Sequence, residues 1–151
     1  MLNFKNFGKG SIVPGYLMIV PNKHVISIAN LSLKHKEKFF KLLPYVKKTL
    51  EKTFNQPAIF FESGSPFGGT KFVNSIIHAH VQTTPLRISK ENMKLMKEQM
   101  FLEPFDYQKD LSSLKNKSYS FLIDSNNNGF ASTSLERPRQ IFRKIIAERN
   151  K

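Results

Sequence analysis

The chain contains no cysteine, which excludes disulfide bonds, catalysis by a thiolate and zinc sites built on cysteine. It also lacks a long apolar run. The longest near the start, YLMIV at 16–20, is too short to cross a bilayer, and no secretory pattern precedes it. These absences predict a cytoplasmic protein, in a reducing compartment, that does not insert into membranes.

Acidic residues are few, since 11 Asp and Glu stand against 24 Lys and Arg, and the formal net charge is +13. Such an excess attracts polyanions, among them nucleotides and nucleic acids. The lysines are scattered along the sequence without a dense arginine stripe, so a compositional bias with solvated lysines explains the charge equally well. The charge alone does not decide the function.

The 151 residues, of which 40% are hydrophobic, fit a single domain spanning 1–151. Helical spacing of apolar residues predicts a first helix over 30–54, with Ser32 as its N-cap and Pro44 kinking or dividing it. Period-two patterns and turn residues predict strands, and further helical patterns follow. The expected strands are 16–21, 58–63, 72–85 and 118–124, and the expected later helices are 88–100, 110–117 and 137–150.

The two strands on either side of the glycine-rich loop at 64–71 favour antiparallel pairing. We therefore expect an α+β fold, with an antiparallel sheet of about five strands and flanking helices. Neither a repeat nor a low-complexity segment indicates a second domain.

Two of the four histidines lie in the segment SIIHAHVQTTP at 75–85. Alternation along a strand places His78, His80 and Gln82 on one face, with i and i+2 side chains roughly 6.5 to 7 Å apart. Two imidazoles at that separation can reach one phosphate, and each can attack phosphorus or transfer a proton near neutral pH. Structural histidines and a zinc site are the alternatives that the spacing leaves open.

Residues beyond this pair resemble the histidine triad (HIT-like) superfamily. The order is GYLMIVPNKHV at 15–25, a helix, FFESG at 60–64 and then IIHAHVQTTP, and the ERPRQIFRKIIAER helix resembles a terminal helix of a microbial branch. Glutamine replaces the third histidine of the strand. This H-x-H-x-Q pattern is similar to that of galactose-1-phosphate uridylyltransferases and diadenosine-tetraphosphate phosphorylases. The resemblance implies a HIT-like fold, and the segment before Gly15 is short relative to the superfamily.

The resemblance also implies roles for single residues. His80 would be the nucleophile at the α-phosphorus of a nucleotide, the carbonyl of His78 would fix its tautomer, and Gln82 would hold a nonbridging phosphate oxygen. His24 would contact the phosphate or the leaving group. The implied substrate contacts are Ser75 and Asn74 near the phosphate, Glu62 toward a sugar hydroxyl or an imidazole, and the loop glycines Gly64 and Gly69. His35 is expected in solvent. Arg143 is expected either to screen a phosphate or, as the favoured alternative, to be an ordinary exposed helix residue.

The sequence thus predicts a nucleotidyltransferase or nucleotide hydrolase that works through a nucleotidyl-histidine intermediate, with no metal or cofactor. The alternative is a non-catalytic nucleic-acid-binding module of the splicing-associated type, which the basic charge would suit. A nucleotide is the expected partner. The resemblance also allows a homodimer, and nucleic acid is a secondary candidate partner.

Overall fold

A computed structural model of the chain describes residues 2–5, 13–64, 78–138 and 141–149. The elements follow in the order β1 Leu2–Lys5, β2 Leu17–Pro21, η1 Ile28–Asn30, α1 Leu33–Phe54, β3 Ala58–Gly64, β4 Val81–Pro85, α2 Lys90–Gln99, β5 Glu103–Pro104, α3 Tyr107–Asp110, η2 Leu111–Leu114, β6 Tyr119–Ile123, β7 Gly129–Ser132 and α4 Ile141–Arg149.

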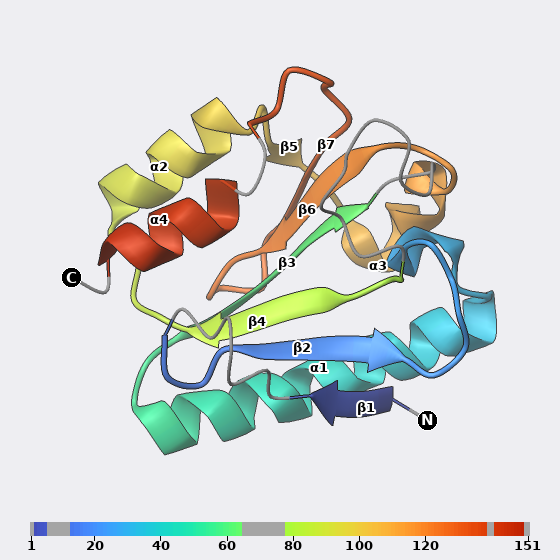
Figure 1. Ribbon diagram of the computed structural model, residues 1–151, viewed down its shortest axis with the longest axis horizontal. Helices are drawn as coiled ribbons and strands as arrows, with labels where there is room; N and C mark the ends of the chain where they lie inside the picture. Colours follow the sequence, from blue (N-terminus) through green and yellow to red (C-terminus); the bar gives the residue numbers. More distant parts are fainter. Residues whose placement is uncertain (1, 6–12, 65–77, 139–140, 150–151) are drawn as a thin grey trace.

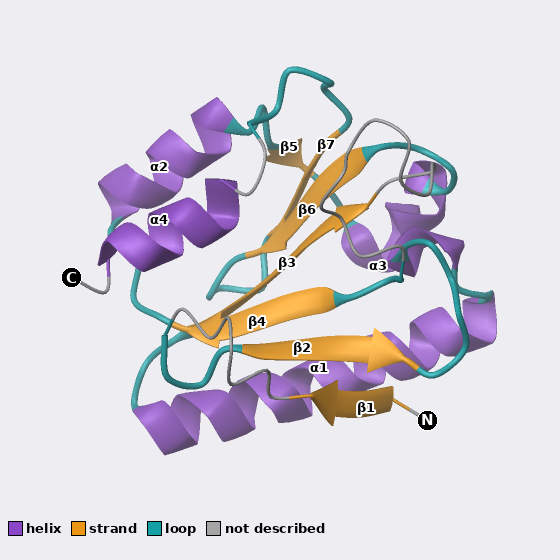
Figure 2. Cartoon of the chain, in the orientation of Figure 1, coloured by secondary structure: helices purple, strands orange, loops and turns teal. Residues whose placement is uncertain are grey.

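The strands of these residues form one antiparallel sheet in the order β1-β2-β4-β3-β6-β7-β5, shown in Figures 1 and 2. The α+β class and the antiparallel pairing of β3 with β4 are confirmed. The sheet has seven strands in the described ranges, so the expectation of about five was too low. β1, β5 and β7 were not expected because runs of two to four residues show too little alternation to be recognised.

Helix α1 confirms the predicted first helix and its cap. The Ser32 side chain accepts a hydrogen bond from the backbone N–H of His35, which satisfies one of the free amides of the first turn. Of the two outcomes expected at Pro44, a kink or a division, the division is wrong, because α1 runs unbroken to Phe54. Pro44 removes one backbone donor on the exposed side, while Leu43 and Val46 beside it are buried and hold both halves against the sheet.

Each face of the sheet carries its own core. Helix α1 packs on one face, where Phe39, Leu43, Val46 and Leu50 meet strand residues such as Phe60 and Phe121. Helices α2 and α4 cover the other face, where Met96 and Phe142 pack against Phe61 and Leu122. Figure 1 shows α1 passing behind the sheet and α4 in front of it. The side chains of successive strand residues therefore divide between two layers.

Strand β2 is positioned by a tight turn. The turn at Pro14 and Gly15 was predicted and is present, and Gly15 adopts φ +83°. A Cβ there would lie 2.6 Å from the ring of Pro85, so both the backbone conformation and the close approach require glycine. β2 then pairs with β4, with Met18 opposite Gln82, and ends at Pro21 as expected.

The later helices follow the sequence pattern. Ser89 caps α2 by accepting from the backbone N–H of Asn92, as predicted. The expected short helix at 110–117 corresponds to η2 and the end of α3. α4 begins at Ile141 in the described ranges, and Gln140 lies outside them.

Candidate functional site

The histidine segment leaves the sheet just before β4. The prediction that His78 and His80 lie within the strand is wrong, because β4 begins at Val81. The backbone N–H of Ala79 donates to the carbonyl of Val25 at 2.7 Å, and that of His80 donates to the carboxyl of Glu62. These two amides therefore do not take part in the hydrogen bonds between strands. The bond from Ala79 draws the segment toward Val25, which follows β2 in the chain.

The ring of His80 is held in one tautomer by its neighbour. Its Nδ1 lies 2.8 Å from the carbonyl oxygen of His78. Because a carbonyl only accepts, Nδ1 carries the proton and Nε2 keeps a free lone pair. Burial lowers the pKa of His80, and the charges of His78 and Arg143 lower it further against the opposing effect of the His78 carbonyl. The ring is thus a neutral imidazole near pH 7, as a nucleophile requires.

The other two histidines of the predicted site lie side by side. The ring of His78 uses Nε2 to donate to the carbonyl of Pro21 at 2.7 Å, so it is anchored to the end of β2. The ring of His24 packs edge-on against it, with centroids 5.1 Å apart. His24 is exposed and His78 is half-buried. The segments PNKH and HAH are therefore brought together, although more than 50 positions separate them in sequence.

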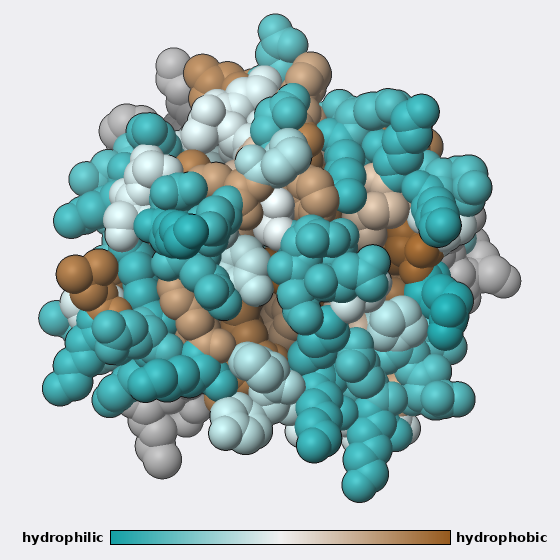
Figure 3. Space-filling model, turned by 180° about the vertical axis from the view of Figure 1, so that it is seen from behind, coloured by the Kyte–Doolittle hydropathy of each residue, from teal (hydrophilic) through white to brown (hydrophobic). Residues whose placement is uncertain are grey.

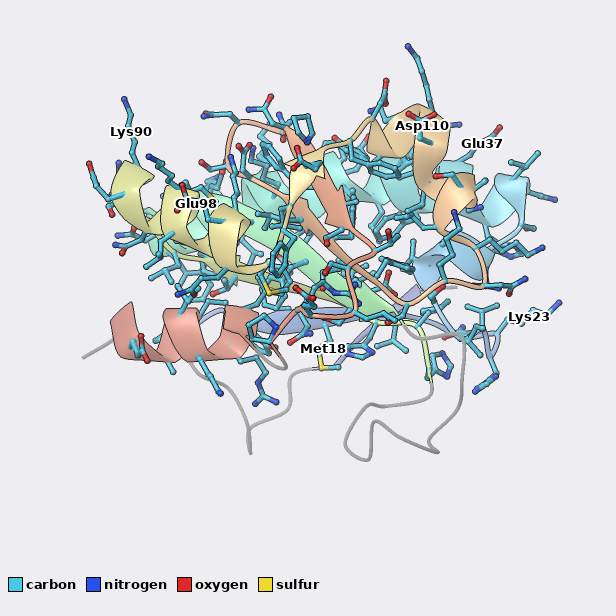
Figure 4. The ribbon with its side chains drawn as sticks, turned by 90° about the horizontal axis from the view of Figure 1, so that it is seen from above. Met18, Lys23, Glu37, Lys90, Glu98 and Asp110 are labelled. Carbon is cyan, nitrogen blue, oxygen red and sulfur yellow. The ribbon has the colours of Figure 1, made fainter. Side chains whose placement is uncertain are left out.

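Gln82 is oriented by Tyr16, which lies directly before the neighbouring strand β2. The hydroxyl of Tyr16 donates to Oε1 of Gln82, so the amide nitrogen keeps both of its N–H donors. Burial raises the pKa of Tyr16 to about 12, with a smaller opposing effect from Arg143, so the hydroxyl stays protonated and remains a donor. Met18, the register partner of Gln82, points to the side of the sheet on which α4 lies (Figure 4).

Arg143 of α4 adds positive charge to this face of the sheet. Its charge lowers the pKa of both His80 and Tyr16, which places it within electrostatic reach of both. The side chain is half-buried. The expectation of an ordinary exposed helix residue therefore does not describe it. A guanidinium beside a neutral imidazole and an amide donor is a suitable environment for a phosphate.

Glu62 lies beneath the histidine segment and is only 1% exposed. Its carboxyl accepts hydrogen bonds from the hydroxyl of Tyr119 and the backbone N–H groups of Ile28 and His80. Burial raises its pKa to about 7, against the opposing effect of these three donors. The carboxyl therefore holds the backbone of His80 in place, a contact that the sequence did not predict.

Gly64, predicted as a substrate contact, has a packing reason to be glycine. A Cβ at this position would lie 2.3 Å from the ring of Tyr119, the donor to Glu62. The other predicted substrate contacts, Ser75, Asn74 and Gly69, lie outside the described residues. His35 is exposed, as expected, with its Nδ1 2.6 Å from the hydroxyl of Ser32.

Metal ligands and membrane spans can be assessed for the described ranges. No group of three or more His, Cys, Asp or Glu side chains there is arranged to hold a metal ion. The zinc alternative through His24, His78 and His80 therefore finds no support in that part of the chain. None of the described helices has both the length and the apolar character needed to cross a bilayer.

Comparison of the sequence with protein-family models and with curated proteins finds no match.

Sequence reasoning assigned no role to Tyr16, and for Arg143 an exposed helix position was favoured over contact with a phosphate. Tyr16 lies within the segment GYLMIVPNKHV, but no residue pattern there indicated a role for its hydroxyl. The available signal was the two-residue spacing of Tyr16 and Met18, which pack in the same core cluster, while Met18 pairs with Gln82. No comparable signal marks Arg143, because only the packing of α4 brings it near His80.

Proposed function

We propose that this chain is a nucleotidyltransferase or nucleotide hydrolase of the histidine triad type, with His80 as its nucleophile. The observation that carries the proposal is the 2.8 Å contact between Nδ1 of His80 and the carbonyl oxygen of His78. It leaves Nε2 unprotonated, and the lowered pKa of His80 keeps it so at neutral pH.

In the proposed reaction, Nε2 of His80 attacks the α-phosphorus of a nucleotide. A P–N bond forms, the bond from phosphorus to the leaving oxygen breaks, and the leaving group departs with the electron pair. Arg143 and the amide N–H groups of Gln82 stabilise the negative charge on the nonbridging oxygens. An acceptor oxygen then attacks the same phosphorus, transfers a proton to solvent and releases His80.

Gln82 limits which leaving groups are suitable. A histidine at this position could donate a proton to the departing group, whereas an amide cannot. The leaving group must therefore be stable as an anion, such as phosphate or pyrophosphate. The proposed enzyme prefers phosphoanhydrides to phosphoramidates, and its intermediate reacts with a phosphate acceptor faster than with water.

The test is a turnover screen of nucleoside di- and triphosphates, nucleotide sugars, dinucleoside polyphosphates and adenosine phosphoramidate. Each donor is incubated with and without inorganic phosphate as the acceptor. Turnover of at least one anhydride by the parent, lost in His80→Ala and kept in His35→Ala, supports the proposal. A phosphoramidate turned over far better than every anhydride would contradict the interpretation of Gln82.

A further inference from the structure

Helix α1 carries a line of lysines that becomes apparent only when the sequence is wound into a helix. With 3.6 residues per turn, these side chains fall within roughly 80° of arc, and they extend over about 27 Å of the helix axis. All of them are exposed. We call them the lysine stripe, and they are Lys34, Lys38, Lys41, Lys48 and Lys52.

Two other lysines of the same helix have a different role. Nζ of Lys36 donates to the hydroxyl of Ser112 at 2.7 Å and is buried, and Nζ of Lys47 donates to the carbonyl of Ser125 at 2.5 Å. These lysines connect α1 to the rest of the domain. In contrast, no hydrogen bond or ion pair in the described ranges involves the ammonium groups of the stripe. The stripe therefore carries five charges that have no hydrogen-bond or ion-pair partner among the residues that the structure describes.

An aromatic side chain interrupts the stripe at its widest gap. Tyr45 lies between Lys41 and Lys48 on the same arc, and it is 73% exposed. Its ring is thus accessible to a flat partner, with ammonium groups on either side along the helix. Glu37 lies at one margin of the arc and is the acidic residue nearest to it by helical position.

The stripe and the candidate site lie on opposite sides of the sheet. α1 packs on one face, whereas Met18, the partner of Gln82, points to the face that α4 covers. Figure 3 shows the side on which α1 lies, and hydrophilic side chains cover most of it. A ligand of the lysine stripe would therefore be distinct from a nucleotide bound at His80.

We propose that the lysine stripe and Tyr45 form a binding surface for a single-stranded nucleic acid. The ammonium groups would contact successive phosphates along the helix, and the ring of Tyr45 would stack on an unpaired base. The tyrosine is the reason to choose a single strand, because the bases of a duplex present no free face for stacking. RNA and single-stranded DNA share this chemistry, and the experiment below compares them.

The test is fluorescence anisotropy with labelled RNA and DNA strands of about 12 nucleotides, within the range of known site sizes, and with a duplex of equal length. Lys48→Gln/Lys52→Gln is the main variant. Lys90→Gln/Lys94→Gln on α2 is its charge control, because it removes two exposed lysines at the same i, i+4 spacing; Lys94 differs from the stripe lysines in being paired with Glu98 at 3.8 Å. The exposed positions predict that both variants fold like the parent, which thermal melting checks.

The stripe variant should bind single strands more weakly, with the slope of log K against log salt reduced by about 1.4, or about 0.7 for each phosphate contact. The α2 control should keep the parent slope. Tyr45→Ala should weaken binding about tenfold, and Tyr45→Phe should restore most of it because the stacking ring is retained. His80→Ala should bind like the parent, which separates this surface from the proposed catalytic site.

Equal loss in the α2 control would show that the charge acts without a defined surface and would overturn the proposal. Duplex binding that is tighter than single-strand binding and insensitive to Tyr45→Ala would also overturn it, as would no measurable binding of either single strand at about 0.1 M salt. Tighter binding of the RNA strand or of the DNA strand would show which of the two single-stranded nucleic acids the surface recognises.

Discussion

Replacing Glu62 with glutamine should change how the stability of the domain depends on pH. The carboxyl is 1% exposed and has its pKa raised from 4.5 to about 7. An unfolded chain loses this proton near pH 4.5, whereas the folded chain keeps it until about pH 7. Between these values the folded state binds more protons, so the free energy of unfolding falls as the pH rises. The stabilisation is complete below pH 4.5 and is lost as the pH passes through 7.

The magnitude follows from the difference of about 2.5 between the two pKa values. At 1.36 kcal/mol for each pKa unit, the parent should lose about 3 kcal/mol from this group between pH 4.5 and pH 8. Glutamine has nearly the same shape and does not titrate. Its oxygen can still accept from Ile28, and the hydroxyl of Tyr119 can accept from its amide nitrogen.

The assay is urea unfolding of the parent and Glu62→Gln at several pH values from 5 to 8. Subtracting the two free energies cancels the titration of every other group that is common to both proteins. From pH 5 to pH 8 the difference should move by about 2.5 kcal/mol in favour of the glutamine variant. Parallel curves for the two proteins would refute the assignment of Glu62 as a buried carboxyl that titrates near neutral pH.

Three further predictions follow from the site. His80→Ala should abolish turnover while the melting temperature stays close to that of the parent, because the half-buried ring lies outside the two cores, and His35→Ala should change neither quantity. Arg143→Gln should raise the pKa of His80 and shift the acid limb of the pH profile of kcat/KM to higher pH. Arg143→Lys should keep the parent profile. Identical profiles for all three proteins would refute the electrostatic effect of Arg143 on His80. Gly64→Ala should destabilise the domain by about 1–3 kcal/mol in urea unfolding, because its Cβ would overlap the ring of Tyr119, and unchanged stability would refute that contact.

Much of the fold could be predicted because local patterns were strong. Ser32 and Ser89 marked the starts of α1 and α2, and the apolar run of β3 and the turn at Gly15 were evident from composition. The short strands β5 and β7 could not be predicted, since pairing with neighbours stabilises them more than their own sequence does.

The candidate site was predicted only where its residues are close in sequence or match a motif. The rings of His24 and His78 do lie side by side, but the strand predicted for His78 and His80 was wrong, because backbone bonds to Val25 and Glu62 replace the ladder. These backbone hydrogen bonds depend on tertiary contacts that no local sequence pattern encodes.

The lysine stripe was overlooked for a different reason. Its members are scattered in the linear sequence, and helical spacing aligns them on one face of α1. The pattern was present in the sequence from the start, and plotting the predicted helix by its period of 3.6 would have found it.

The most direct test of the central claim is to trap the intermediate on His80. The protein is incubated with nucleoside triphosphate labelled at the α-phosphorus, quenched in alkali and analysed by mass spectrometry of its peptides. An acid-labile, base-stable nucleotidyl group is expected on His80 and not in His80→Ala, and inorganic phosphate should discharge it faster than buffer alone. Label on another residue, or turnover of the same donor by His80→Ala at the parent rate, would contradict it.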